Sequence, residues 1–475
     1  MLIQDSWGFG LLRDECFWEG PIDSGPIPES GGYFDIIVVG GGPGGSAAAF
    51  YAAERGLRVL LLERRVFPDT KVCGDAVGGR SLSFIKEMGI KERLESGAHF
   101  RVLGITFSDG KNFIEIPLPE EEIESKEAGY SIPRIRTDWL LFNRATEVVR
   151  ENSGAVIQGF AVKEILYDDG KGGDDPGHGS GDGRRIIGVT GLHGGRGGEE
   201  LSFTAPMTVG AGGYNCPVAR GIVKDTYGES MLMRKHMCGG FRQYWRNVGG
   251  FTTNSGNIEI HFVDNMVNGY FWVFGVGEGV CNVGIGMLMS DMDKTKKKLK
   301  ALQHEIITSH PSFVERFADA EFVEGSSKGW QLPFGDPRNK KELESHQPRR
   351  AFMAGAVCIG DAASLVDGFS GEGVSHAFIT GKMAALAFDK ETHAGGFPLA
   401  AGAEYQQELW KTLGPILTNS YKLQKLIRKK WLLRRFLKKA AVKPGLQDML
   451  LEALANKEEQ EMIHNKWFIA RQVLF

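Results

Sequence analysis

The stretch that most constrains this chain is Phe34 to Glu63, which reads as a strand, a glycine turn, a helix and a second strand. The apolar run Ile36–Val39 has the length and β-branching of a buried parallel strand. A G-x-G-x-x-G turn follows it, made by Gly40, Gly42 and Gly45. The first glycine allows a tight turn, the second lets the backbone approach a pyrophosphate, and the third lets helix Ser46–Arg55 pack closely on its strand.

The second strand of this unit, Val59–Leu62, ends at Glu63. A carboxylate about 20 residues after such glycines suits the ribose hydroxyls of an adenosine half. The helix N-terminus favours an anion through its unpaired N–H groups and its dipole, without a basic side chain. Because strand, helix and terminal acid are all present, the segment predicts a dinucleotide site rather than a flexible loop.

Length and composition set wider bounds on the chain. Its 475 residues suggest several domains, while a net charge of −3 and a pI near 6.4 give no reason to expect a nucleic acid partner. The 6 cysteines show neither C-x-x-C pairs nor metal-ligand spacing, which predicts reduced thiols, a cytoplasmic protein and no metal site. We also expect neither a signal peptide nor a membrane-spanning helix, because no basic leader and no apolar run of about 18 residues is present.

A second glycine-rich motif occupies residues 356–385, AVCIGDAASLVDGFSGEGVSHAFITGKMAA. Its strand-like residues AVCI lead into Gly360 and Asp361. This arrangement resembles the GDAA element of hydroxylase-type flavoproteins. The resemblance implies that Asp361 meets the pyrophosphate or ribityl region, and that N–H groups around Gly371 and Gly373 face the N1–C2=O edge of the flavin. A helix N-terminus there stabilises an anionic reduced flavin. With the first motif, this element predicts FAD as the cofactor.

A third signal is the loop K-x-CGD, which contains Cys73 and Gly74. After a dinucleotide fold, this loop resembles that of the geranylgeranyl reductase family, FAD-dependent flavoproteins with the p-hydroxybenzoate hydroxylase architecture that include digeranylgeranylglycerophospholipid reductases. The resemblance implies that the loop lies beside the isoalloxazine ring and that Cys73 faces the substrate cavity. A buried structural thiol is the alternative. Arg64 and Gly74 are further flavin contacts that the resemblance implies.

The family's R-x-x-x-D-x-x-L segment is matched by Arg134, Asp138 and Leu141 within an amphipathic stretch. It implies that Arg134 approaches the flavin, and a surface ion pair is the alternative. In residues 208–220, Gly212 and Cys216 stand where the family has Asp and Ser. In related hydroxylases that Asp handles the nicotinamide donor, so the change argues against direct reduction by NAD(P)H. The reduced donor, ferredoxin or NAD(P)H, stays undecided.

An aromatic strand supplies the substrate motif. Tyr270, Trp272 and Phe274 occur at period two and would share one face of the strand. They match the family pattern Y-x-W-x-F-P followed by V-G-x-G, except that Gly275 replaces the proline. The resemblance implies an isoprenoid substrate on this face, whereas a plain core stripe is the alternative. As catalytic residues we expect Cys73 to donate a proton, with a bound water as the alternative donor, and Tyr270 and Trp272 to stabilise carbocation character by cation–π attraction worth about 2 kcal/mol.

Two remaining stretches carry local composition signals. Residues 422–443 contain 10 Lys or Arg and no acid, interleaved with apolar and aromatic residues. This pattern fits either an anionic membrane surface or an ordinary solvated helix. Residues 168–198 are dominated by glycine and charge, which predicts a mobile hairpin or an insertion without a core.

The expected fold is α/β (α+β overall), a Rossmann-like FAD-binding domain interleaved with an antiparallel-sheet substrate domain and followed by C-terminal helices. We assign 1–32 to an extension, 33–100, 133–224 and 345–395 to the FAD domain, 101–132 and 225–344 to the substrate domain, and 396–475 to the helices. The expected activity is saturation of C=C bonds in geranylgeranyl chains, above all of archaeal-type digeranylgeranyl glycerophospholipids. Alternatives are another prenylated substrate (geranylgeranyl diphosphate, or a chlorophyll or menaquinone side chain), a flavin monooxygenase or halogenase, and a non-catalytic prenyl carrier.

Overall fold

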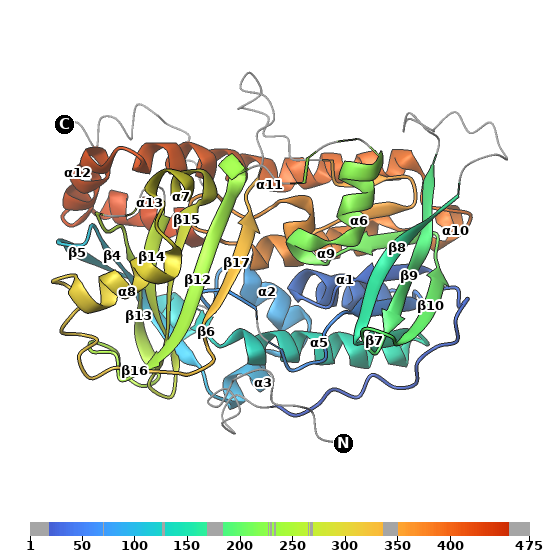
Figure 1. Cartoon of the computed structure of the whole chain (residues 1–475), viewed down its shortest axis with the longest axis horizontal. Helices are drawn as coiled ribbons and strands as arrows, with labels where there is room; N and C mark the ends of the chain where they lie inside the picture. The colour runs from blue at the N-terminus through green and yellow to red at the C-terminus, as the bar shows by residue number, and fades with distance from the viewer. Residues whose placement is uncertain are drawn as a thin grey trace.

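The computed structural model describes residues 19–455 apart from 70, 126–128, 169–183, 227, 229, 232–233, 265, 267–268 and 336–349, and apart from the side chains of 426–427, 448–449 and 452–455. Two sheets lie side by side along the long axis of the molecule, and the helix α11 (Leu399–Ile427) runs along one edge of both (Figure 1). The N-terminal part of the described chain lies across α5 (Arg134–Glu151), where the Trp139 indole N–H donates to the carbonyl of Gly20 at 2.7 Å.

The first sheet is the predicted dinucleotide-binding sheet, in the order β18-β19-β11-β1-β2-β7. All its neighbours pair in parallel except β18 and β19. Its strands are β1 (Ile36–Val39), β2 (Val59–Glu63), β7 (Ala155–Gln158), β11 (Met207–Gly210), β18 (Phe352–Met353) and β19 (Ala356–Cys358). Every residue of β1 is buried, as its unbroken apolar run predicts.

The helix α1 (Pro43–Glu54) packs between α5 and α9 (Val374–Ala387), so the two glycine motifs come from neighbouring helices. Small residues allow this close approach. A Cβ atom added at Gly381 would lie 2.5 Å from the carbonyl oxygen of Gly44. The sequence of small residues in α9 is therefore required by helix packing.

The second sheet has 10 strands and carries the predicted aromatic strand. Its strands are β3 (Ala76–Val77), β4 (Phe100–Ser108), β5 (Phe113–Pro117), β6 (Tyr130–Ser131), β12 (Met237–Arg246), β13 (Ser255–His261), β14 (Gly269–Gly277), β15 (Val280–Leu288), β16 (Glu321–Phe322) and β17 (Lys328–Pro333). Pairing is antiparallel except between β4 and β13. β3 lies within the range assigned to the FAD domain but pairs with β6, so the chain crosses between the units there.

A three-stranded sheet, β8 (Phe160–Asp168), β9 (Arg185–His193) and β10 (Glu199–Thr204), corrects one expectation. For residues 185–193 the prediction of an insertion without a core is wrong, because Ile186 and Val189 are fully buried. The glycines there are packing positions: a Cβ at Gly188 would lie 2.1 Å from the carbonyl oxygen of Phe203. Residues 169–183 lie outside the described residues.

The remaining helices surround these sheets. They are α2 (Arg80–Glu87), α3 (Lys91–Ser96), α4 (Glu120–Glu124), α6 (Pro217–Arg220), α7 (Met289–Thr295), α8 (Leu299–Ser309), α10 (Lys390–His393), α12 (Lys430–Ala440) and α13 (Pro444–Ala455), with short turns η1 (Gly213–Asn215), η2 (Gly221–Thr226), η3 (Arg234–His236) and η5 (Gly360–Ala363). α12 and α13 bury Phe436, Leu437 and Leu450 against one face of the second sheet. Within the described part of the chain, no helix combines the length and apolarity needed to cross a membrane.

Candidate active site

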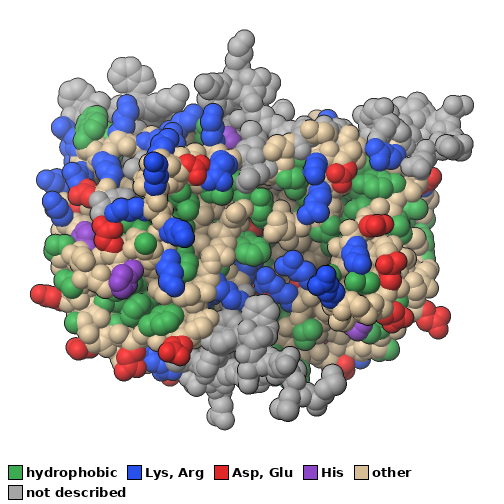
Figure 2. Space-filling model, viewed as in Figure 1, with side chains coloured by type: hydrophobic (Ala, Val, Ile, Leu, Met, Phe, Trp, Pro, Cys, Tyr) green, Lys and Arg blue, Asp and Glu red, His purple; other side chains and the backbone are tan. Residues whose placement is uncertain are grey.

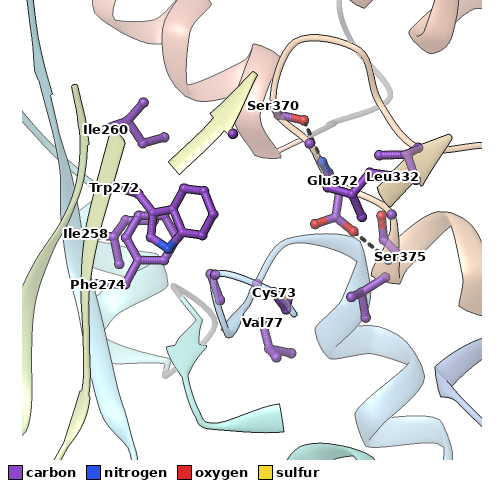
Figure 3. A pocket seen from close by; sticks show the side chains of 18 of the residues that line it. Cys73, Val77, Ile258, Ile260, Trp272, Phe274, Leu332, Ser370, Glu372 and Ser375 are labelled. Atoms are coloured by element: carbon purple, nitrogen blue, oxygen red, sulfur yellow. Dashed lines mark hydrogen bonds between the residues drawn. The ribbon is translucent and has the colours of Figure 1, made fainter. Parts of the chain in front are cut away.

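A cavity of about 290 Å³ lies where the two sheets meet. Figure 3 shows Trp272 and Phe274 on one side of it, Ser370 and Glu372 on the opposite side, and Cys73 between them. Its walls therefore come from the predicted aromatic strand, the second glycine motif and the cysteine loop. Aliphatic side chains complete the lining, among them Val77, Val102, Ile105, Ile258, Ile260 and Leu332.

The first glycine turn opens onto this cavity at Pro43, the first residue of α1. A Cβ at Gly40 would lie 2.5 Å from the carbonyl oxygen of Ala211, and one at Gly45 would lie 1.7 Å from that of Gly40. Gly42 differs, because a Cβ there would meet no atom within 4 Å. The fold needs the first and third glycines, whereas the second faces open space at a helix N-terminus without a side-chain cap. This cradle fits a pyrophosphate.

Glu63 ends β2 beside the glycine turn. Its carboxylate accepts hydrogen bonds from the backbone N–H of Gly41 at 2.6 Å and of Arg65 at 2.9 Å. The side chain therefore fixes the turn and keeps an anionic group at the edge where a ribose would bind. Arg64, the next residue, is exposed and does not line the cavity.

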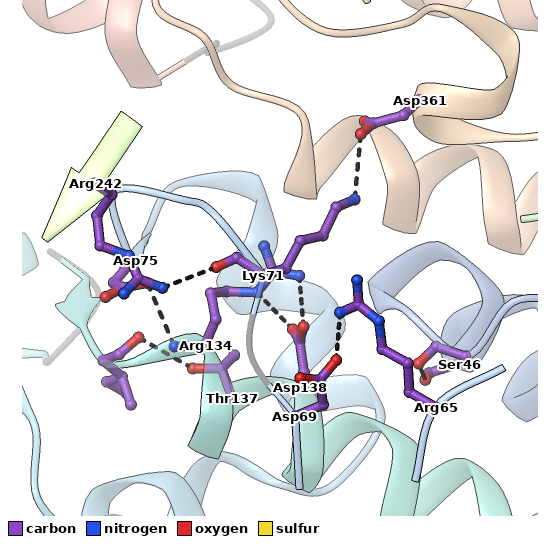
Figure 4. Close-up of polar contacts among 12 residues, drawn as sticks. Ser46, Arg65, Asp69, Lys71, Asp75, Arg134, Thr137, Asp138, Arg242 and Asp361 are labelled. Atoms are coloured by element: carbon purple, nitrogen blue, oxygen red, sulfur yellow. Dashed lines mark hydrogen bonds and ion pairs between the residues drawn. The ribbon is translucent and has the colours of Figure 1, made fainter. Parts of the chain in front are cut away.

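The second glycine motif contributes the opposite wall. Asp361, Gly371 and Gly373 line the cavity, and the Asp361 carboxylate lies 3.3 Å from Lys71 Nζ (Figure 4). Gly360 lies behind them, where its N–H donates to Thr380 Oγ1. α9 begins at Val374 with Gly373 as its N-cap, and its N-terminal residues line the cavity. The Glu372 carboxylate, which sequence reasoning did not single out, accepts the Ser375 N–H at 2.6 Å.

Cys73 lies in the cavity wall and is only partly exposed. Burial raises the pKa of its thiol, and the positive charge of Arg134 opposes that effect. Arg134 is itself buried in a two-point ion pair with Asp138, at 2.5 and 2.7 Å (Figure 4). It also lines the cavity, so it is neither an isolated surface residue nor a free cation. Gly74 packs under Phe274, whose ring would lie 2.7 Å from a Cβ there.

The aromatic residues share one face, as their period predicted. The ring centroids of Tyr270 and Trp272 are 5.9 Å apart, and those of Trp272 and Phe274 are 6.5 Å apart. Gly284 on the paired strand makes room for the indole, since a Cβ there would lie 2.0 Å from the ring. The Tyr270 hydroxyl donates to the carbonyl of Ser370, which links this strand to the second glycine motif.

Three buried polar residues behind the cavity wall were not predicted: Asp75, Tyr244 and Asn282. Asp75 belongs to the K-x-CGD loop, so its motif was visible in the sequence. Tyr244 and Asn282 lie on β12 and β15 without any local signal, because only the folded sheet brings them to the loop. Over the described residues, no group of three or more His, Cys, Asp or Glu side chains could hold a metal ion.

The fold, the two glycine turns and the cradle at Gly42 define the chain as an FAD-dependent oxidoreductase. The family model for FAD dependent oxidoreductases matches residues 35–88. The chain is 28% identical over 364 residues to a digeranylgeranylglycerophospholipid reductase of Methanosarcina mazei, covering 76% of each chain. It is 24% identical over 367 residues to a menaquinone reductase of Mycobacterium tuberculosis, covering 75% of this chain and 76% of that protein.

Solved structures share the fold. A geranylgeranyl bacteriochlorophyll reductase-like protein of Thermoplasma acidophilum superposes with a TM-score of 0.65 at 20% identity, covering 93% of this chain and 96% of the other. A flavin-dependent brominase superposes with a TM-score of 0.64 at 19% identity, covering 89% and 93%. The resemblance to the geranylgeranyl reductase family, the fold class and FAD as cofactor are thereby confirmed.

Proposed function

We propose that this enzyme saturates C=C bonds of geranylgeranyl chains, with digeranylgeranyl glycerophospholipids as its substrates. The observation that carries the proposal is the cavity, which places a thiol, an aromatic face and aliphatic walls beside the second glycine motif. An isoprenoid chain needs such an apolar site, because about 25 cal/mol is gained for each Å² of apolar surface removed from water. The relatives named as digeranylgeranylglycerophospholipid reductases support the same substrate class.

Gly40, Gly42, Gly45, Glu63, Asp361, Gly371 and Gly373 would hold FAD, and Arg134 and Gly74 would adjoin it. Bound reduced FAD supplies a hydride. The chain must supply the matching proton, since an isolated alkene has no carbonyl that a hydrogen bond could polarise. Cys73 is the candidate donor because burial raises the pKa of its thiol and keeps it protonated.

The aromatic face has a complementary role. As the proton reaches one alkene carbon, positive charge develops on the other, and aromatic faces attract such charge. The rings of Tyr270, Trp272 and Phe274 all line the cavity and are therefore placed to stabilise it. The burial of Trp272 and Phe274 also excludes water, which would compete for a cationic carbon.

The basic C-terminal stretch supports peripheral binding to an anionic membrane, where the lipid substrate resides. Figure 2 shows Lys and Arg side chains gathered over the end of the molecule that holds α7 and α12 in Figure 1. Trp431 is 60% exposed on α12, whereas Phe436 and Leu437 face inward. An exposed indole among lysines suits a headgroup region.

The deciding experiment incubates dithionite-reduced protein anaerobically with digeranylgeranylglyceryl phosphate and follows the lipid by mass spectrometry. We expect a gain of two hydrogens for each bond reduced. A second arm supplies menaquinone, because a relative is named as a menaquinone reductase. In a separate aerobic assay, substrate-dependent oxygen consumption without lipid reduction would point instead to a monooxygenase or halogenase. Lack of bound flavin would point to a prenyl carrier.

A further inference from the structure

A buried amide joins the cysteine loop to the aromatic strand. Asn282 is fully buried on β15, where it makes three hydrogen bonds and uses both of its N–H donors. Its Oδ1 accepts from the Trp272 indole N–H at 2.8 Å. Its Nδ2 donates to the Cys73 carbonyl and to the Asp75 carboxylate, each at 2.7 Å. One side chain thus holds both the candidate proton donor's backbone and the central ring of the aromatic face.

The chemistry of the three partners leaves this amide a single orientation. An indole N–H can only donate, so it must meet the amide oxygen. The Cys73 carbonyl can only accept, and the Asp75 carboxylate already accepts from its other neighbours, so both must meet the amide nitrogen. A flipped amide would leave these groups unpaired in a buried site, which is costly.

The Asp75 side chain, which orients the Asn282 amide, is itself fixed by hydrogen bonds. It is fully buried, and its carboxylate accepts from the Tyr244 hydroxyl at 2.6 Å and from the Arg134 backbone N–H at 3.3 Å. Its backbone has φ of 72°, a left-handed conformation that Asp and Asn tolerate better than most residues. Burial raises the pKa of Asp75, and Arg242, Tyr244 and Asn282 act in the opposite direction.

We propose that Asn282, oriented by Asp75, is a positioning residue that fixes the Trp272 indole relative to Cys73, an inference that rests on the proposed function. The substrate chain is flexible and apolar and offers no polar group near the alkene by which the enzyme could orient it. The protein must therefore fix both sides of the alkene itself. A misplacement of about 1 Å in such a geometry costs a rate factor on the order of 10².

The test compares four variants. Asn282→Asp keeps the acceptor for Trp272 but places an oxygen against the Cys73 carbonyl and the Asp75 carboxylate. Asp75→Asn removes the charge and tolerates the same backbone. The double variant Asp75→Asn/Asn282→Asp restores a donor and an acceptor between the two positions, although the Cys73 carbonyl still faces an oxygen, so only part of the loss should be recovered. Gln303→Leu is the matched control, because this buried amide donates to the carbonyl of Val283, the residue after Asn282, from α8 instead of from the cavity.

Each variant is assayed anaerobically with dithionite and digeranylgeranylglyceryl phosphate, and its bound FAD is measured by absorbance. We expect Asn282→Asp to lower kcat by about 10² with KM within about threefold and FAD content unchanged. We expect the double variant to regain at least about tenfold in kcat, and Gln303→Leu to retain the parent value. A recovery of kcat in the double variant, at unchanged FAD content, would show that the hydrogen bond between positions 75 and 282 controls the rate.

Two outcomes overturn the proposal. The first is a kcat for Asn282→Asp within about threefold of the parent. The second is a loss of kcat in Asn282→Asp that is proportional to a loss of bound FAD and is not restored in the double variant. If Asn282→Asp does not fold, Asp75→Asn decides: we expect a kcat lowered about tenfold with FAD retained, and a parent-like kcat rejects the role. A parent enzyme that reduces no lipid would reject the proposed function itself, which is a different result.

Discussion

Two thiols line the cavity, those of Cys73 and Cys238, and Cys73 is the proposed proton donor. Cys73→Ser preserves size but puts a much weaker acid in place of the thiol. We expect the variant to keep FAD and its reduction by dithionite, while alkene reduction falls by about 10²–10⁴, or roughly 3–5 kcal/mol of barrier. Lipid mass spectrometry and flavin absorbance measure the two steps separately.

The control for this prediction is Cys281→Ala, which removes a thiol on β15 of the second sheet that is buried in an apolar cluster away from the cavity. It should retain lipid reduction. The pH dependence gives a further check, since burial raises the pKa of Cys73 above its ordinary value. The protonated donor therefore persists through neutral pH, and the rate should fall only as the pH rises through that raised value. If Cys73→Ser stays within about threefold of the parent, another group donates the proton.

Gly42 gives a second test at the scale of one residue. A Cβ at this position meets nothing within 4 Å, so Gly42→Val should fold normally. Its side chain would nevertheless occupy the space of a pyrophosphate, and we expect a colourless protein with an unchanged circular dichroism spectrum. Gly45→Val is the contrasting variant, because its Cβ would lie 1.7 Å from the Gly40 carbonyl and should prevent folding. Full flavin occupancy in Gly42→Val would contradict this placement of FAD.

Secondary-structure elements show why part of the fold could be predicted and part could not. β1, α1 and β2 follow local signals that no tertiary contact overrides: an apolar run, a glycine spacing and a terminal acid. β9 was misread because its glycines suggested flexibility, whereas they allow close strand packing. The parallel pairing of β4 with β13 was also invisible, because it joins residues more than 150 positions apart, as between Ser108 and His261.

The basic C-terminal helices are predicted to bind an anionic membrane surface. Some of their basic residues are already paired, such as Arg428 with Asp291 and Arg434 with Asp264. The exposed lysines free for an anionic surface include Lys422, Lys429 and Lys438. Changing these three to Gln should weaken binding to phosphatidylserine vesicles by about 3 kcal/mol, since each basic residue contributes about 1 kcal/mol near such a surface.

Vesicle sedimentation at low salt measures this effect. The matched control changes three exposed lysines outside the stretch, Lys163, Lys224 and Lys411, and should bind like the parent. Equal losses in both triple variants would indicate a nonspecific charge effect. Unchanged binding in the first would assign the basic stretch 422–443 to ordinary solvated helices.

At the scale of the whole molecule, the site exists only because the two sheets are interleaved in the chain. The hydrogen bond from Asn282 to Asp75 joins residues 207 positions apart, and the bond from Tyr244 to Asp75 spans 169. The sequence motifs identified residues on each side of the cavity. They could not show the buried network behind it, because its members have no periodic pattern and acquire partners only in the folded sheet.

This interleaving predicts how the molecule should respond to its cofactor. The loop after β2 carries Lys71, Cys73 and Asp75 from the first sheet into contact with the second, and Lys71 reaches back to Asp361. A ligand held at this junction binds only when both units are folded, so its binding free energy stabilises both. At free FAD about 100 times its dissociation constant, the gain is about 2.7 kcal/mol. For a chain of this size, that corresponds to a rise of about 3 °C in Tm.

Differential scanning calorimetry of the flavin-stripped and reloaded protein should therefore show one transition that moves upward as a whole. Gly42→Val, which keeps the fold but blocks the pyrophosphate space, should show no shift on adding FAD. Two separate transitions, of which FAD moves only one, would mean that the sheets unfold independently and that the buried network does not couple them.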